Sequence, residues 1–111
     1  MKNAPVVNVV GIRCQPQAKE KFLKWYDQTH VPLLLKFKGL KKVTRYKILK
    51  CDEAYPEHLA IFEFENEQAF VAYESSPELA AASAEMRETW KDGGWDRMWR
   101  VQYEFIKTWS K

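Results

Sequence analysis

Four stretches with the residue pattern of β-strands run along the chain, at residues 6–14, 41–50, 58–65 and 95–109. The first is rich in valine, and in the third apolar side chains stand at both alternating sets of positions. The last is the longest, and most of its odd positions carry large rings. Strict alternation predicts one shared face for Trp95, Trp99, Val101, Tyr103, Phe105 and Trp109.

Helical spacing fills the first gap between these strands. Pro16 opens a stretch in which apolar residues recur every three or four positions as far as residue 29. We expect a bend at His30 and Val31, because a residue before proline is disfavoured in the α region. A short turn over residues 33–38 should then stop at Gly39, a natural helix-ending residue.

A second helical region separates the third and fourth strands. Asn66 is a suitable cap for a helix that carries Phe70 and Tyr73. Ser76 and Pro77 then introduce an alanine-rich helix over residues 79–91, which the two glycines after it should end.

The order strand, helix, strand, strand, helix, strand predicts an α+β fold of the split βαβ type, with residues 1–111 as one domain. Its four-stranded antiparallel sheet should run fourth, first, third, second, with both helices on one face. The other face would carry Val7, Val9, Leu59 and Ile61. An uncovered apolar face of this size favours a partner, so we expect a homodimer packed sheet against sheet.

Composition supports a soluble chain with more rings than a small core needs. Of 111 residues 46% are hydrophobic and 14% aromatic, so we expect rings to line a pocket or an interface as well. The net charge of +3 is too weak to indicate nucleic acid or an anionic membrane. No apolar run approaches the roughly 20 residues of a membrane span. The start of the chain lacks a signal-peptide pattern, and a cytoplasmic location is expected.

Cysteine and glycine usage bears on cofactors. Cys14 and Cys51 lie far apart without a CxxC motif, which indicates reduced thiols rather than a zinc site. Across the predicted sheet they should stay too far apart to pair. The chain has no glycine-rich phosphate loop and no metal-ligand motif. We therefore expect no cofactor and no metal.

The densest group of reactive side chains ends the first helical stretch. Tyr26 and His30 are four residues apart and share a helix face, while Asp27 could orient the imidazole of His30. His30 could then act as a general acid or base. The alternative is structural, because a helix dipole favours a terminal histidine and rings such as Trp25 are usually core. His58 opens a strand after a loop, where a solvated side chain is expected.

The runs FLKWYDQTHVPLLLKFKGLKKVTRYKIL and AIFEFENEQAFVAY resemble the dimeric α/β-barrel superfamily, and within it EthD-like proteins. The similarity rests on a tryptophan-tyrosine pair, a histidine and a proline at the helix end, then a glycine-leucine step into an arginine-tyrosine strand. In this sequence these are Trp25, Tyr26, His30, Pro32, Gly39, Leu40, Arg45 and Tyr46. The resemblance implies a ferredoxin-like protomer that pairs into a barrel, with an apolar pocket between sheet and helices.

The resemblance further implies a small hydrophobic ligand, often aromatic or polyketide-like. Reactions in such families include cofactor-independent monooxygenation, isomerisation, dehydration and cyclisation. The candidate catalytic residues are His30, Tyr26 and Asp27, and the candidate ligand-binding residues are Trp25, Tyr46, Arg45, Trp99 and Phe62. Arg45 or Arg100 could hold a carboxylate or enolate, unless they pair with Glu63 or Glu104.

Two other classes of function remain to be weighed against an enzyme. A catalytically silent dimer that binds a small molecule would have the same sequence features. An RNA-recognition module would share the element order, but such modules stack bases on exposed rings of the first and third strands. Leu59 and Ile61 stand where those rings belong, so nucleic acid is not an expected partner.

Overall fold

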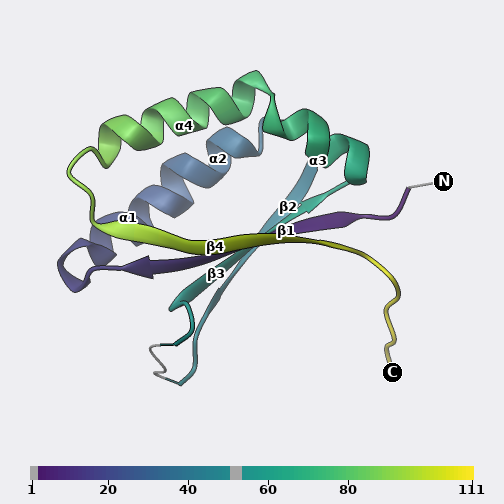
Figure 1. The fold of residues 1–111 in the computed structure, drawn as a ribbon, viewed down its shortest axis with the longest axis horizontal. Helices are drawn as coiled ribbons and strands as arrows, with labels where there is room; N and C mark the ends of the chain where they lie inside the picture. Colours follow the sequence, from purple (N-terminus) through teal and green to yellow (C-terminus); the bar gives the residue numbers. More distant parts are fainter. Residues whose placement is uncertain (1–2, 51–53) are drawn as a thin grey trace.

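The computed structural model of the protein describes residues 3–50 and 54–111. Four antiparallel strands form one sheet in the order β2-β3-β1-β4, which confirms the predicted order (Figure 1). The strands are β1 (Val6–Cys14), β2 (Leu40–Lys47), β3 (His58–Phe64) and β4 (Trp95–Glu104). β4 thus ends before Phe105 and Trp109, because the paired length of β1 limits it.

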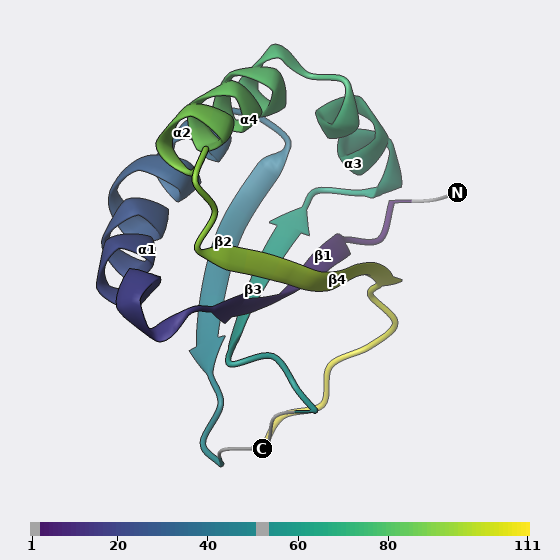
Figure 2. The same cartoon turned by 60° about the vertical axis from the view of Figure 1, so that its left-hand side comes forward.

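The helices all cover one face of this sheet, as Figures 1 and 2 show. They are α1 (Lys19–Trp25), α2 (Val31–Leu34), α3 (Glu67–Glu74) and α4 (Pro77–Thr89). The predicted caps of the last two are present. Asn66 Oδ1 accepts a hydrogen bond from the Ala69 amide at 2.8 Å, and Ser76 Oγ accepts one from the Leu79 amide at 3.1 Å. Caps of this kind contribute about 1 kcal/mol each.

The predicted bend before Pro32 is wrong, because the chain stays helical there. His30 and Val31 have φ of −65° and −61°, and a π-helical turn over Tyr26–His30 joins α1 to α2. Its wider turn is closed by the Val31 amide, which donates to the Tyr26 carbonyl five residues earlier. Pro32 consequently lies within this continuous helical stretch, near the start of α2, and because it has no N–H it cannot donate to a carbonyl of the π-helical turn.

Gly39 also differs from the prediction. It does not adopt a positive φ, which in the described residues only Gly93 and Gly94 do. A Cβ at Gly39 would lie 2.8 Å from Ala69 Cβ and 2.8 Å from a ring carbon of Phe37. Close packing, rather than a helix-ending backbone conformation, therefore requires glycine at this position.

The core between sheet and helices is unusually rich in rings. Phe22 of α1 is fully buried, and its ring centroid lies 5.1–6.1 Å from those of Trp25, Tyr26, Trp90 and Trp95. Phe62 and Phe64 extend this layer from β3, where they face the helices. Some of the many aromatic side chains thus belong to the core itself.

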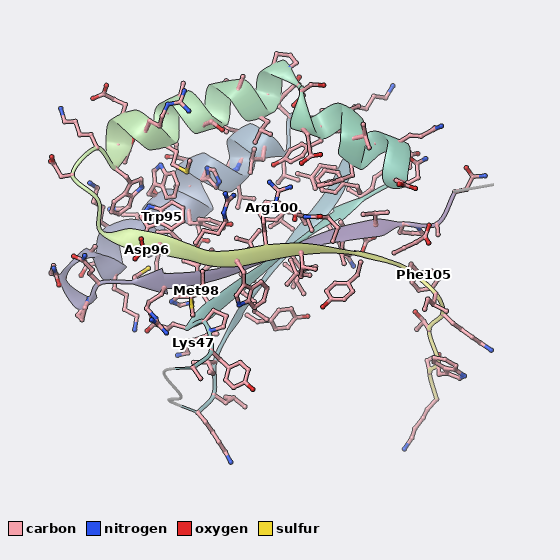
Figure 3. All side chains as sticks on the ribbon, viewed as in Figure 1. Lys47, Trp95, Asp96, Met98, Arg100 and Phe105 are labelled. Atoms are coloured by element: carbon pink, nitrogen blue, oxygen red, sulfur yellow. The ribbon has the colours of Figure 1, made fainter. Side chains whose placement is uncertain are left out.

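A β-bulge in β4 divides its side chains differently from strict alternation. Ile12 pairs with Arg97 and Gly11 with Trp99, so Met98 is an extra residue. Trp95 therefore faces the helices, and the prediction that it shares a face with Trp99 is wrong. Figure 3 shows Trp95 and Arg100 on the helix side of β4, with Met98 on the other side.

The second sheet face is covered by none of the described helices (Figure 2). Its residues come from all four strands and are mainly apolar: Val7, Val9, Tyr46, Leu59, Ile61, Trp99, Val101 and Tyr103. Trp99 is 41% exposed and Tyr103 59% exposed. We call this surface the open face.

Two further expectations concern cysteine and membranes. Cys14 is a free, buried thiol, whose pKa burial raises to about 11. The predicted separation from Cys51 falls on a residue outside the described part of the chain. Within residues 3–50 and 54–111, no helix has the length and apolarity needed to cross a membrane.

Candidate functional site

A cavity of about 100 Å³ lies between the sheet and the helices. Strands β1, β3 and β4 form its floor, and the π-helical turn, α2, α3 and α4 form its walls. Its apolar lining includes Val10, Ile12, Leu34, Phe62, Leu79, Met86 and Trp95. We call this space the helix-side cavity.

His30 reaches this cavity from the π-helical turn. Its ring stacks on Trp25, with centroids 4.7 Å apart and planes 26° apart. Nδ1 is buried and has no hydrogen-bond partner within the part of the chain that the structure describes. Burial lowers the pKa of His30 to about 4, against the opposing charge of Glu85. The imidazole is therefore neutral at pH 7 and retains one free lone pair.

Glu85 of α4, rather than Asp27, is the carboxylate associated with His30. Trp25 Nε1 donates a hydrogen bond to Glu85 Oε1 at 2.8 Å, which fixes the indole on which His30 stacks. Asp27 is exposed and accepts a hydrogen bond from Arg45 Nη1 at 2.6 Å. The predicted orientation of His30 by Asp27 is thus not what the structure shows, because Asp27 pairs with Arg45 while His30 lines the cavity.

Tyr26 and Tyr73 add two phenol groups to the cavity lining. Burial raises the pKa of Tyr26 well above its usual value, although Arg45 and Arg97 partly oppose this. Burial likewise raises the pKa of Tyr73 to about 12. Both phenols stay protonated near neutral pH, so either can donate a hydrogen bond to a bound molecule.

The predicted ligand-binding residues fall into two groups. Phe62 lines the helix-side cavity and Trp25 stands behind His30. Tyr46 and Trp99 lie on the open face instead, because Tyr46 pairs with Leu59 and Trp99 with Gly11. There they line a separate apolar hollow of about 280 Å³. The expectation that Tyr46 and Trp99 surround the same ligand as His30 is therefore wrong.

The two candidate arginines also have partners other than those considered. Arg45 pairs with Asp27 and lies 5.6 Å from the centre of the Tyr26 ring. Arg100 Nη2 donates to Glu74 Oε2 at 2.9 Å. Neither Glu63 nor Glu104 takes the predicted role, since the π-helical turn brings Asp27 to Arg45 and α3 brings Glu74 to Arg100.

Sequence reasoning missed several residues of the cavity. Asn8 is a polar residue within a valine-rich strand, and its buried Oδ1 accepts a hydrogen bond from Gln102 Nε2 at 2.8 Å. Its even-numbered position beside buried valines was the available signal. Arg97 lines the cavity only because of the bulge at Met98, for which the amino-acid pattern gives no sign.

His58 is buried rather than solvated, with 3% of its surface exposed. β3 is an inner strand, so His58 lies between Ile12 of β1 and Lys47 of β2. Burial lowers its pKa, and neither ring nitrogen has a hydrogen bond within the described residues. It borders a shallow hollow of about 260 Å³ with Arg45 and Lys47, apart from the helix-side cavity.

No group of three or more histidine, cysteine, aspartate or glutamate side chains suited to a metal ion occurs among residues 3–50 and 54–111.

The sheet order, the one-sided helices and the cavity between them define a ferredoxin-like α+β protein. Solved structures share this fold at low identity. A hydroxynitrile lyase from Passiflora edulis aligns with a TM-score of 0.74 and 14% identity over 97% of this chain and 99% of that one. An ethyl tert-butyl ether D (EthD) family protein from Bacillus halodurans C-125 aligns with a TM-score of 0.67 and 17% identity, over 91% of this chain and 99% of that one. The resemblance to EthD-like proteins is thus confirmed at the level of the fold.

A third similar structure is described as a dimeric protein of ferredoxin-like fold, from Bacteroides fragilis NCTC 9343. It aligns with a TM-score of 0.66 and 18% identity over 95% of this chain and all of that one. Residues 6–95 match the family described as Domain of unknown function (DUF4286), and the chain belongs to that family. The search of curated proteins found no match to this chain. The family match ends at Trp95, the first residue of β4.

Proposed function

We propose that the protein binds a small hydrophobic molecule in the helix-side cavity and that His30 transfers a proton to or from it. The proposal rests on the buried Nδ1 of His30, for which the described residues supply no hydrogen-bond partner. A buried polar atom without a hydrogen bond costs about 1–3 kcal/mol. A ligand that forms a hydrogen bond with the imidazole would remove this cost.

The neighbouring phenol defines the chemistry that the site supports. The Tyr26 and His30 ring centroids are 5.1 Å apart, so one small ligand can contact both. Tyr26 would donate a hydrogen bond to a ligand carbonyl oxygen while His30 takes a proton from the adjacent carbon. The electron pair of that C–H bond moves into the carbonyl, which gives an enolate. This step can begin an isomerisation, a dehydration or a cofactor-independent oxygenation.

The low pKa of His30 sets a condition on this step. Surrounded by protein groups alone, the ring is a weak base, because burial lowers its pKa to about 4. A negative charge that develops on a bound ligand would favour the protonated ring and raise that pKa. Proton transfer is therefore expected only with a ligand in place.

The open face supports a homodimer as part of this proposal. Its apolar side chains from four strands would be buried against a second copy of the sheet. The dimeric ferredoxin-like protein from Bacteroides fragilis has the same fold. In such a dimer each protomer keeps its own helix-side cavity, because the helices cover the opposite face.

Proton exchange into simple ketones tests the function. The protein should speed the exchange of hydrogen for deuterium beside the carbonyl of 2-butanone or cyclopentanone, followed by NMR in D₂O. His30→Gln should abolish the acceleration, whereas His58→Gln, the matched change at the other buried histidine, should retain it. Quenching of tryptophan fluorescence reports binding separately, since Trp25 stacks on His30 and Trp95 lines the cavity.

Three outcomes separate the possibilities. Binding with exchange that depends on His30 supports an acid–base enzyme. Binding without exchange contradicts the enzyme and leaves a small-molecule-binding dimer. No response from any ketone, or one unaffected by His30→Gln, contradicts the assignment of the site.

A further inference from the structure

The bulge of β4 brings Arg97, an exposed residue, to the lining of the helix-side cavity. If β4 were regular, with no bulge at Met98, alternation would put Arg97 on the open face with Trp99. The bulge turns it to the helix side, where it lines the cavity. Bulges are frequent beside functional sites, where they redirect one side chain. The irregularity therefore has a specific consequence, which is one more cation at the cavity.

The other charged groups of the cavity are already paired. Arg100 is bound by Glu74, the only carboxylate among the described lining residues. Arg45, on the neighbouring part of the sheet, is bound by Asp27. Arg97 has no ion pair within residues 3–50 and 54–111. The cavity consequently carries one positive charge that the protein itself does not neutralise.

This charge acts on the part of the cavity that the proposed chemistry uses. Arg97 is close enough to Tyr26 to oppose the effect of burial on the pKa of its phenol. Tyr26 in turn is the immediate neighbour of His30. Apolar side chains such as Ile12, Leu34 and Met86 line the same cavity. The site thus offers a cation, a hydrogen-bond donor and an apolar wall.

We propose that the ligand is a small monocarboxylic acid, with its carboxylate held by Arg97 and its apolar body beside His30. This inference rests on the proposed function of the same cavity. A guanidinium binds a carboxylate through two parallel hydrogen bonds, and one unpaired cation matches one negative charge. A phosphate dianion would meet a single free cation and the carboxylate of Glu74. The volume of about 100 Å³ holds little more than one ring.

Matched acid and amide pairs test the proposal. Isobutyrate with isobutyramide, and benzoate with benzamide, differ in charge but hardly in shape. Wild-type protein should bind each acid at least about tenfold more tightly than its amide, measured by NMR titration of the His30 ring signals. Arg97→Gln should remove this preference while amide binding persists. Arg87→Gln, the same charge change at an exposed position on α4, should leave it intact.

The amide measurements separate this inference from the function on which it rests. If acid and amide bind equally well to wild-type protein, or if Arg97→Gln keeps the preference, Arg97 is not the anchor, while the hydrophobic site stands. If neither the acids nor the amides bind, the inference fails together with the proposed function. Amide binding to Arg97→Gln also shows that this variant is folded.

Discussion

The two faces of the sheet are built from the same four strands and differ in what covers them. On the helix side, Phe62 and Phe64 of β3 are buried beneath the helices. On the open face, Leu59 and Ile61 of the same strand are only half-buried, and Trp99 of β4 is exposed. One face is therefore complete within a single chain, whereas the other still has apolar surface in contact with water.

This difference assigns the aromatic surplus to two separate tasks. Trp25 and Trp95 belong to the ring cluster that surrounds His30 and its cavity. Trp99 and Tyr103 belong to the open face, where a second copy of the chain would bury them. A single bulge at Met98 decides which residues of β4 serve each task. A site and an interface can thus share a strand without sharing side chains.

Charge in the middle of the open face should abolish the dimer. Val101 pairs with Val9 at the centre of this face, so Val101→Glu would bury a carboxylate against the partner's sheet. An unpaired buried charge costs several kcal/mol, so we expect the dissociation constant of the dimer to rise by roughly 100-fold or more. Light scattering should give twice the chain mass of 13.2 kDa for the wild type and the single-chain mass for the variant.

Val71→Glu is the matched control for this experiment. Val71 is an exposed valine on α3, on the helix side of the sheet, and its replacement should leave the dimer intact. A wild-type chain that is already monomeric at micromolar concentration would contradict the role of the open face. So would a Val101→Glu variant that remains dimeric.

Acid should destabilise the helix side through His30. An unfolded histidine titrates near 6.5, whereas burial lowers the pKa of His30 to about 4. Between these values the unfolded chain binds a proton that folded His30 does not, so the free energy of unfolding falls as the pH drops from 6.5 to 4. The loss attributable to His30 is about 3 kcal/mol at most.

Urea unfolding at one protein concentration, at pH 7 and pH 4.5, measures this loss. His30→Gln should lose less free energy of unfolding than the wild type over this interval. Part of the decrease should remain, because burial also lowers the pKa of His58. An equal loss in the wild type and in His30→Gln would show that His30 is not held neutral by burial.

The carboxylate that acts on His30 can be identified by a smaller change. Glu85 raises the pKa of His30 against burial, so Glu85→Gln should lower this pKa further. Asp27 pairs with Arg45, and Asp27→Asn should leave the pKa unchanged. An NMR titration of His30 in both variants compares them, and the shift for Glu85→Gln should be smaller than the effect of burial. If only Asp27→Asn shifted the pKa of His30, Asp27 would be the carboxylate that acts on His30, as the sequence predicted.

The fold could be predicted from the sequence because its signals are local. The apolar run of β3 and the Asn66 and Ser76 caps are each read within a few residues, and the order of the elements then leads to the observed sheet order. The site was predicted only in part. His30, Tyr26 and Phe62 do meet at one cavity, since they follow from one helix end and one strand face.

The missed features depend on contacts between distant segments. The bulge at Met98 results from pairing with β1, and it moves Trp95 and Arg97 to the helix side. The burial of His58 depends on its place in an inner strand. The π-helical turn replaces a break that proline alone would indicate. None of these has a pattern in the neighbouring sequence.

The central claim is that ligand binding belongs to the helix side and assembly to the open face. The five tryptophans report on both regions, and their indole N–H signals can be followed in one titration with benzoate. We predict that the signals of Trp25 and Trp95, near His30, move together with the His30 ring signals, while that of Trp99 stays in place. Movement of the Trp99 signal with no change at Trp95 and His30 would contradict the account.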